Sequence, residues 1–238
     1  MKIANGVEML EISANLTLGP GILHPVLIWD QDEAILVDTG LPGQLPQIME
    51  AVEKAGVPFA KLSKIIITHH DLDHVGSLTR ILKESPHKIA VLAHEQEKPY
   101  IQGEQLPIKI AQSKTIPEEQ LEKIKLIYGN KVDRMVTDGE ELPCCGGMIV
   151  IYTPGHTPGH ISLFLKESKI LITGDAMNVV DGKLLGPAPQ FTFDMAMAVN
   201  SLKKLTPYEI ETVICYHGGL YKGHVNRRIA ELANGNGL

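Results

Sequence analysis

The most constraining feature of this sequence is a cluster of metal-ligand side chains that directly follows an apolar run. The β-branched run 64–68 is typical of a buried strand, and the residues after it include four potential ligands within six positions. These are His69, Asp71, Asp73 and His74. In α/β folds, strand ends open into the crevice beyond the sheet edge, where ligands bind. Imidazole and carboxylate groups suit Zn²⁺, Mn²⁺ or Fe²⁺, so the cluster predicts a metal site at a sheet edge.

Three later residues of the same kind also follow predicted strands. His156 comes after strand 148–153, Asp175 after 170–173 and His217 after 212–215, each with a glycine close by. Glycine lets the backbone turn tightly and approach a ligand closely. Any one of these residues could be a surface or capping group, as Asp73 could be for the helix after it. Four strand ends of the same chemistry in one chain favour a shared site.

The order of elements predicts a layered α/β protein, since strands are followed by helices twice along the chain. The expected strands are 7–12, 22–29, 33–38, 64–68, 89–93, 132–136, 148–153, 161–165, 170–173 and 212–215, and the expected helices are 45–55, 75–83, 194–205 and 225–233. Gly19-Pro20-Gly21 is expected to be a turn. From His94 to Tyr128 the pattern is helical but broken by prolines. We expect a single domain, 1–238, with a helical insertion at about 94–128.

Composition gives no support for nucleic-acid binding or for a membrane protein. A net charge of −6 without long runs of one sign gives no reason to expect a nucleic-acid partner. The start of the chain lacks the apolar run of a signal peptide, and no window is long and apolar enough for a membrane helix, so we expect a cytoplasmic protein without a membrane partner. Cys144, Cys145 and Cys215 have no CxxC spacing and are expected to be buried thiols.

The ordered set of candidate ligands resembles the metallo-β-lactamase superfamily, in its glyoxalase II-like and lactonase-like branch. The resemblance runs from Leu36-Val37-Asp38-Thr39-Gly40 to His217-Gly218-Gly219. His69, Asp73 and His74 fall on the first His and the final Asp-His of the family motif HxHxDH. His156, Asp175 and His217 fall on its three later ligands. Asp71 departs from the pattern because the family usually has its second His there, which makes this an HxDxDH variant.

The resemblance implies an αββα four-layer sandwich with the site at one edge of two facing sheets. It also implies two divalent metal ions. One would be held by His69, Asp71 and His156, the other by Asp73, His74 and His217, with Asp175 bridging them. Asp38 would support the site without binding metal. Asp71 adds a negative charge and a hard oxygen, which tilts preference towards Mn²⁺ or Fe²⁺, although Zn²⁺ remains the first expectation.

The activity implied is hydrolysis of an ester, thioester or lactone bond in a small metabolite by a metal-activated hydroxide, with Asp73 and Asp175 as catalytic residues. The alternatives are a phosphodiesterase, a mononuclear iron persulfide dioxygenase and a metal-stabilised scaffold without turnover. Antibiotic hydrolysis is disfavoured because several true β-lactamases have a cysteine at the position of Asp175. The family also suggests a possible homodimer.

The remaining histidines and the insertion yield further expectations. His70 should point away from the metals and have a structural role. His160 is expected either to hydrogen-bond a ligand or to be an ordinary loop histidine, and His24 could contact substrate. The insertion could cap the site or be a solvated helical segment. Its candidate specificity residues, together with one residue after the predicted bridging Asp, are Tyr100, Lys109, Lys114 and Asn178.

Overall fold

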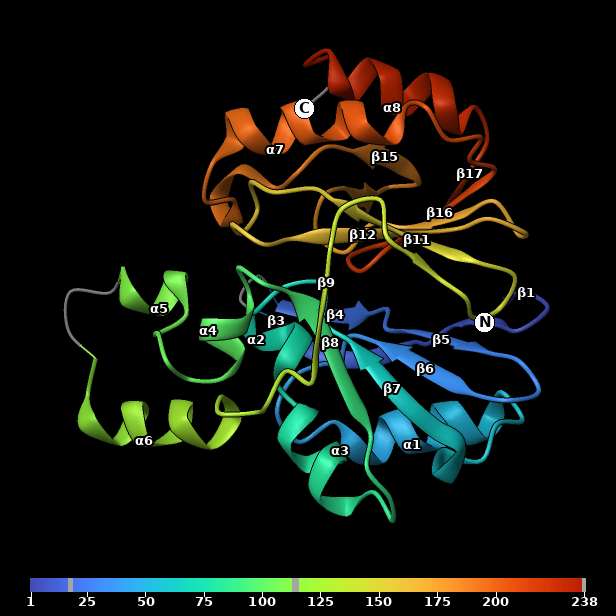
Figure 1. Ribbon diagram of the computed structural model, residues 1–238. Coiled ribbons are helices and arrows are strands. Elements are labelled where there is room, and N and C mark those ends of the chain that lie inside the picture. The colour runs from blue at the N-terminus through green and yellow to red at the C-terminus, as the bar shows by residue number, and fades with distance from the viewer. Residues whose placement is uncertain (17–18, 113–115, 237–238) are drawn as a thin grey trace.

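Two stacked β-sheets form the centre of the protein (Figure 1). The computed structural model describes residues 1–16, 19–112 and 116–236. The first sheet has the order β1-β2-β5-β6-β7-β8-β9 and the second β10-β11-β12-β13-β16-β17. The bounds of the first sheet are β1 Lys2–Ala4, β2 Val7–Met9, β5 Val26–Trp29, β6 Ala34–Val37, β7 Leu62–Ile66, β8 Ala90–His94 and β9 Arg134–Val136. Those of the second are β10 Glu141–Leu142, β11 Met148–Tyr152, β12 Ile161–Leu165, β13 Ile170–Ile172, β16 Thr212–Cys215 and β17 Gly219–Lys222.

Helices cover the outer face of each sheet, and two hairpins complete the chain (Figure 1). The helices are α1 Leu45–Lys54, η1 Phe59–Lys61, α2 Leu72–Val75, α3 Leu78–Glu84, α4 Lys98–Ile101, α5 Ile108–Ala111, α6 Glu118–Ile127, η2 Pro189–Phe191, α7 Met195–Ser201, η3 Leu202–Leu205 and α8 Val225–Ala233. The hairpins pair β3 Ile12–Leu16 with β4 Gly19–Leu23, and β14 Asn178–Val180 with β15 Lys183–Leu185. Within the described ranges, no helix is long and apolar enough to cross a membrane.

Three apolar layers explain this stacking. The middle layer joins side chains of both sheets, such as Val37 and Ile66 of the first and Ile172 and Ile214 of the second. A second layer packs α1 and α3 against the first sheet, and a third packs η3 and α8 against the second. Each sheet is therefore buried on both faces, as the near-continuous apolar runs predict. The αββα sandwich predicted from the resemblance is confirmed.

The topology brings the candidate ligands to one edge. Strands β6, β7 and β8 are parallel, so the segment after β7 leaves the first sheet between its neighbours. Strands β13 and β16 are also parallel, and the segments after them therefore leave the second sheet side by side. The amide of Ile161 donates to the carbonyl of Thr68 over 3.1 Å and joins the two sheets there.

The predicted strand 22–29 is wrong at its centre. It is divided into β4 and β5 at His24-Pro25, because proline has no amide hydrogen to donate and fixes its own backbone. The amide of His24 instead donates to the carbonyl of Tyr216 over 3.1 Å. The expected turn Gly19-Pro20-Gly21 belongs to β4, which pairs with β3. The prediction of buried thiols holds for Cys144 and Cys215, whereas Cys145 is half-buried.

The segment 94–128 contains the three short helices α4, α5 and α6, which project to one side of the first sheet (Figure 1). Pro99 lies in the first turn of α4, whereas Pro107 and Pro117 immediately precede α5 and α6. Proline is tolerated at these positions because helix-initial amides have no intrahelical acceptor. The prolines that interrupt the helical pattern therefore divide the segment into separate helices.

Candidate metal centre

Two adjoining groups of metal-ligand side chains lie at the sheet edge. One comprises His69, Asp71, His156 and Asp175, and the other Asp73, His74 and His217. Within each group the potential ligand atoms lie within 4.8 Å of one another. The structure thus gathers all seven residues predicted from sequence, while their role as ligands stays a prediction.

The first group converges on the carboxylate of Asp71. Its Oδ2 lies 2.9 Å from Nε2 of His156 and 3.2 Å from Nε2 of His69. Although burial by itself raises the pKa of Asp71, hydrogen bonds with His156 and His69 hold that pKa well below its usual value. Burial lowers the pKa of His69 well below its ordinary value. The group therefore offers an ionised carboxylate and a neutral imidazole, the forms that bind cations.

Asp175, a member of the first group, also contacts the second. Its Oδ2 is 3.4 Å from Nε2 of both His156 and His217, and its Oδ1 is 3.3 Å from Nε2 of His74. The second group is completed by Asp73, whose Oδ2 lies 3.2 Å from Nε2 of His217. Burial alone raises the pKa of Asp175, but the neighbouring imidazoles hold it well below its usual value. This position, in contact with both groups, is where a bridging carboxylate would be needed.

The residues present fit divalent cations. Nε2 of His74 and Oδ1 of Asp175 are buried and lie 3.3 Å apart, but neither makes a well-formed hydrogen bond with any described residue. Buried polar atoms are nearly always satisfied in folded proteins, and an ion between these two atoms would satisfy both. The three carboxylates, Asp71, Asp73 and Asp175, also make the cluster strongly anionic, which a cation would offset.

Asp38 contacts His74 on the side of the ring that faces away from Asp175. It accepts hydrogen bonds from the amide of Thr68 over 2.9 Å and from its hydroxyl over 2.8 Å. Its Oδ2 also lies 2.9 Å from Nδ1 of His74. This contact orients the other ring nitrogen, Nε2, towards Asp175, as partners of metal-binding histidines commonly do. Asp38 thus occupies the supporting position that the resemblance implies.

Glu97 is a buried residue that the sequence analysis missed. It lies just before α4 and is fully buried. Its Oε2 accepts from the amide of His70 over 2.8 Å and contacts the His70 ring, whereas its Oε1 accepts from Thr157 Oγ1 and Gly159 N, each over 2.7 Å. One carboxylate therefore joins the insertion, the loop of His69 and the loop of His156. His70 lies outside both ligand groups and contacts Glu97, the placement expected of a structural residue.

His160 and His24 support the loops of the second sheet. The amide of Asp175 donates to Nε2 of His160 over 3.0 Å, and burial lowers the pKa of this histidine to about 3, so its ring is neutral. His160 therefore contacts a candidate ligand, the first of its two predicted roles. Nδ1 of His24 lies 3.1 Å from the carbonyl of Tyr216, and burial lowers the pKa of His24.

Sequence reasoning also missed Tyr216, whose hydroxyl donates to the carbonyl of Asp73 over 2.5 Å.

Gly174 shows why glycine accompanies these ligands. It has a φ of 52°, and a Cβ there would lie 2.7 Å from Nε2 of His160. A larger residue would displace the histidine that holds the amide of Asp175. The tight turn after β13 therefore depends on this glycine.

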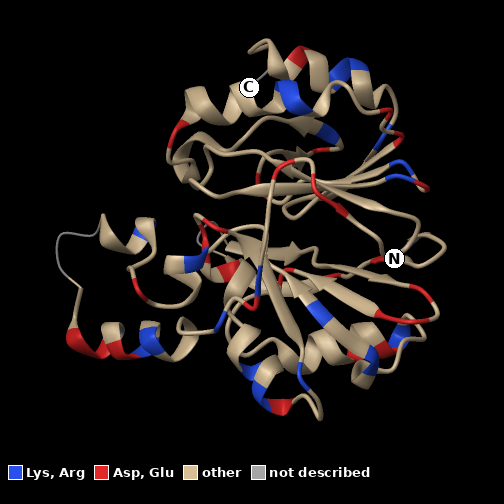
Figure 2. Cartoon of the chain, viewed as in Figure 1, with Lys and Arg blue, Asp and Glu red and all other residues tan. Residues whose placement is uncertain are grey.

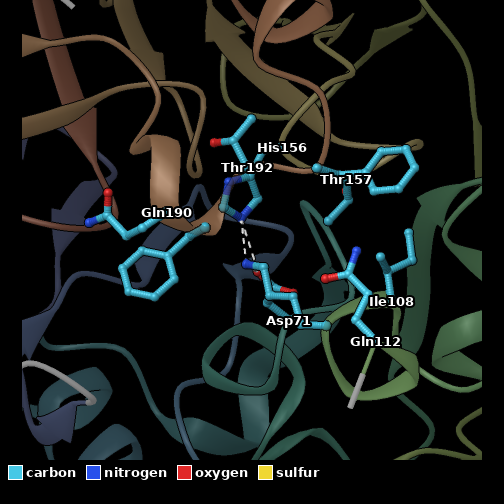
Figure 3. Close-up of a pocket in the computed structure, with 10 residues that line it drawn as sticks. Asp71, Ile108, Gln112, His156, Thr157, Gln190 and Thr192 are labelled. Atoms are coloured by element: carbon cyan, nitrogen blue, oxygen red, sulfur yellow. Dashed lines mark hydrogen bonds and ion pairs between the residues drawn. The ribbon is translucent and has the colours of Figure 1, made fainter. Parts of the chain in front are cut away.

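A cleft of about 90 Å³ opens beside the first group. Its lining includes Asp71 and His156 together with Gln112, Gln190 and Thr192 (Figure 3). Of the candidate specificity residues, Lys109 lines this cleft, whereas Tyr100 stacks on His70 and Asn178 donates to the carbonyl of Gly186. Lys114 lies outside the described residues.

Comparison with known proteins identifies the family. The sequence model of the metallo-beta-lactamase superfamily matches residues 18–217, which include all seven candidate ligands. The chain belongs to the metallo-beta-lactamase superfamily. It is an enzyme of the metallo-hydrolase type, and the fold implies divalent metal binding at the His/Asp cluster.

Relatives and solved structures agree with this assignment. The chain is 33% identical over 218 residues to the probable metallo-hydrolase YflN of Bacillus subtilis, and the alignment covers 84% of this chain and 81% of YflN. It is 28% identical over 159 residues to the hydroxyacylglutathione hydrolase GloC of Haemophilus influenzae, covering 63% of this chain and 65% of GloC. The crystal structure of the family protein TTHA1429 from Thermus thermophilus superposes with a TM-score of 0.74 at 23% identity, covering 98% of this chain and 79% of the other.

Proposed function

We propose that this superfamily member hydrolyses an ester, thioester or lactone bond of a small metabolite with the help of two divalent metal ions, Zn²⁺ being the first expectation. The observation that carries the proposal is the contact of Asp175 with both ligand groups. Such an arrangement supports a paired site instead of two independent ones. When bound, a pair of divalent cations would activate water and stabilise the developing oxyanion.

The chain's own residues would divide the remaining work. His69, Asp71 and His156 would hold one ion, and Asp73, His74 and His217 the other, with Asp175 shared. The Asp73 side chain keeps 22% of its surface exposed, so it is open to solvent and can orient the attacking water. Burial lowers the pKa of His217, but the carboxylates of Asp175 and Asp73 outweigh it and raise that pKa to about 10. The His217 ring must therefore lose a proton when a cation binds.

Two further observations favour acyl-bond hydrolysis. Relatives such as GloC are named hydroxyacylglutathione hydrolases, a name that denotes hydrolysis of an acyl compound. The bridging position also carries an aspartate, Asp175, where several true β-lactamases have cysteine. A phosphodiesterase would use the same set of ligands, and an iron-dependent persulfide dioxygenase would need only one ion, so the test must distinguish all three.

The test combines elemental analysis of the purified protein with a substrate panel. The protein is reloaded with Zn²⁺, Mn²⁺ or Fe²⁺ and assayed on an acyl thioester, a lactone, an aryl ester and a phosphodiester. We expect two metal ions per chain and turnover of an acyl bond. Turnover of the phosphodiester alone would overturn the proposal. One iron per chain with oxygen consumption on a persulfide would do so as well.

Setting and partners follow as part of the same proposal. We infer a small-molecule substrate, no nucleic-acid or membrane partner, a cytoplasmic location and a single domain, 1–238, with the insertion at about 94–128. The small cleft and the intermingled acidic and basic residues visible in Figure 2 support a small substrate over a nucleic acid. A homodimer is proposed from the family resemblance, and light scattering would test it.

A further inference from the structure

Lys109 extends from α5 into the cleft beside the candidate metal centre. Its Nζ contacts Oδ2 of Asp71 and lies 3.2 Å from Nε2 of His156. The side chain is 37% exposed, so it can be reached from the cleft. An ammonium group therefore lies within one hydrogen bond of the side chains proposed to hold a metal ion.

Lys109 is the sole lysine or arginine among the described residues that line the cleft. The other lining groups include the amides of Gln112 and Gln190, the hydroxyl of Thr192 and the ring of Phe191. Nζ of Lys109 lies 5.7 Å from the centre of the Phe191 ring. Since the amides and the hydroxyl are neutral, Lys109 is the group that can match a second negative charge, away from the metal centre, on a molecule that enters.

The position of Lys109 is fixed by the buried network around Glu97. The amide of its neighbour Ile108 donates to Nε2 of His70 over 3.4 Å, and His70 is in turn held by Glu97. α5 is therefore anchored to the same loop that carries His69 and Asp71. The lysine is placed by the fold, unlike a lysine on an unattached surface loop.

We propose that Lys109 binds a carboxylate of the substrate, so that the preferred acyl substrate carries a carboxylate a few bonds from the bond that is cleaved. This inference rests on the proposed hydrolytic function. A cation held by Asp71 would compete with Lys109 for the Asp71 carboxylate. The ammonium on its flexible four-carbon chain would then pair with an incoming anion, and the neighbouring amides could donate to the same group.

A binding experiment tests Lys109 without any turnover. The metal-loaded protein is titrated with succinate and with its monoamide, succinamate, by calorimetry. Both probes have one carboxylate that could reach the metal ions, and they differ only in the charge of the other end. We expect the wild type to bind succinate about tenfold more tightly, as is usual for a hydrogen bond to a charged group. That ratio should fall to about one in Lys109→Met and persist in Lys109→Arg.

The matched control is Lys123→Met on α6, which removes an exposed lysine that pairs with Glu119. It should keep the wild-type ratio. Metal content is measured for every variant, because a loss of metal in Lys109→Met would show that the lysine acts on the ligands and would overturn the inference. Equal affinities in the wild type, no binding of succinate, or a preference that survives in Lys109→Met would overturn it too.

A kinetic arm separates this inference from the proposed function. The substrates are 4-nitrophenyl acetate and the monoanionic 4-nitrophenyl hemisuccinate. Lys109→Met should raise KM for the anionic ester about tenfold and leave KM for the neutral ester within about twofold. If neither ester nor any other acyl substrate is hydrolysed while the succinate preference depends on Lys109, the proposed function fails and the anion site stands. If acyl substrates are hydrolysed but Lys109→Met keeps the preference for succinate, the proposed function stands and the anion site at Lys109 fails.

Discussion

The two sheets contribute to the candidate metal centre in different ways. The first supplies four candidate ligands from one segment after β7, between His69 and His74. The second supplies one each from three loops, as His156, Asp175 and His217. The first contribution is a local motif, and the second exists only because parallel β13 and β16 and the β11–β12 connection end at one edge. The comparison teaches that four of the candidate ligands are predictable from their spacing in the sequence, whereas the other three meet only because of the sheet topology.

The supporting contacts differ in the same way. Carboxylates support the first contribution, since Asp38 orients His74 and Glu97 holds the main chain at His70. Tight turns support the second, with Gly174 allowing His160 to reach the amide of Asp175. Removing each kind of support should therefore have effects of different size.

The largest effect should come from the residue that joins the two contributions. Asp175→Ala should lower kcat/KM by more than about 100-fold, beyond the range typical of residues that only support a metal ligand. The metal content should fall with it, because both groups lose a shared carboxylate. Steady-state kinetics and elemental analysis measure these changes. His87→Ala, at an exposed position, should be nearly silent, and full activity of Asp175→Ala would disprove the bridge.

Glu97→Ala should produce the next largest change. Breaking a buried, hydrogen-bonded pair costs about 3–5 kcal/mol, and here the His70 ring, the Thr157 hydroxyl and the Gly159 amide all lose their acceptor. Urea unfolding should show this loss, and metal titration should show about 10–100-fold weaker binding. Glu95→Ala, two positions earlier and exposed, is the control. Equal stability of the two variants would show that Glu97 does not hold the first contribution.

His160→Ala should have a smaller effect on the second contribution. It removes the acceptor of the Asp175 amide and the ring partner of the Thr153 hydroxyl, and we expect about tenfold weaker metal binding with a loss of about 1–3 kcal/mol in the free energy of unfolding. Metal titration of His160→Ala beside Glu97→Ala would rank the two supports. A greater loss from His160→Ala would reverse the order proposed here.

The smallest effect should concern the contact between the sheets at His94. Its ring stacks on Tyr152 at 4.3 Å, and burial lowers its pKa below the ordinary 6.5. The unfolded chain therefore binds a proton more readily, so stability falls as the pH drops below about 6.5. His94→Gln should make this slope shallower by at most about 1.4 kcal/mol per pH unit. Chemical denaturation between about pH 7 and 5 measures it, and an unchanged slope would remove His94 from the account.

Sequence alone predicted most of the fold and all seven residues of the cluster, for identifiable reasons. Buried strands have apolar runs on both faces, and each candidate ligand follows such a run. Glu97 escaped because it is one acidic residue in an irregular helical segment, and its partners Thr157 and Gly159 are distant in sequence. The β3–β4 hairpin escaped because Gly19-Pro20-Gly21 has the composition of a turn, although its pairing with β3 makes it a strand.

The burial of Glu97 at the start of α4 has a consequence for redesign of the enzyme. The Glu97 carboxylate, at the start of the insertion, is what joins the insertion to the two ligand loops. Lys109, which lines the cleft, comes twelve positions later in the chain. Residue 97 is thus a natural crossover point for chimaeras. Segments exchanged after it, provided that a backbone amide still meets His70, would bring new selectivity to an unchanged reaction centre.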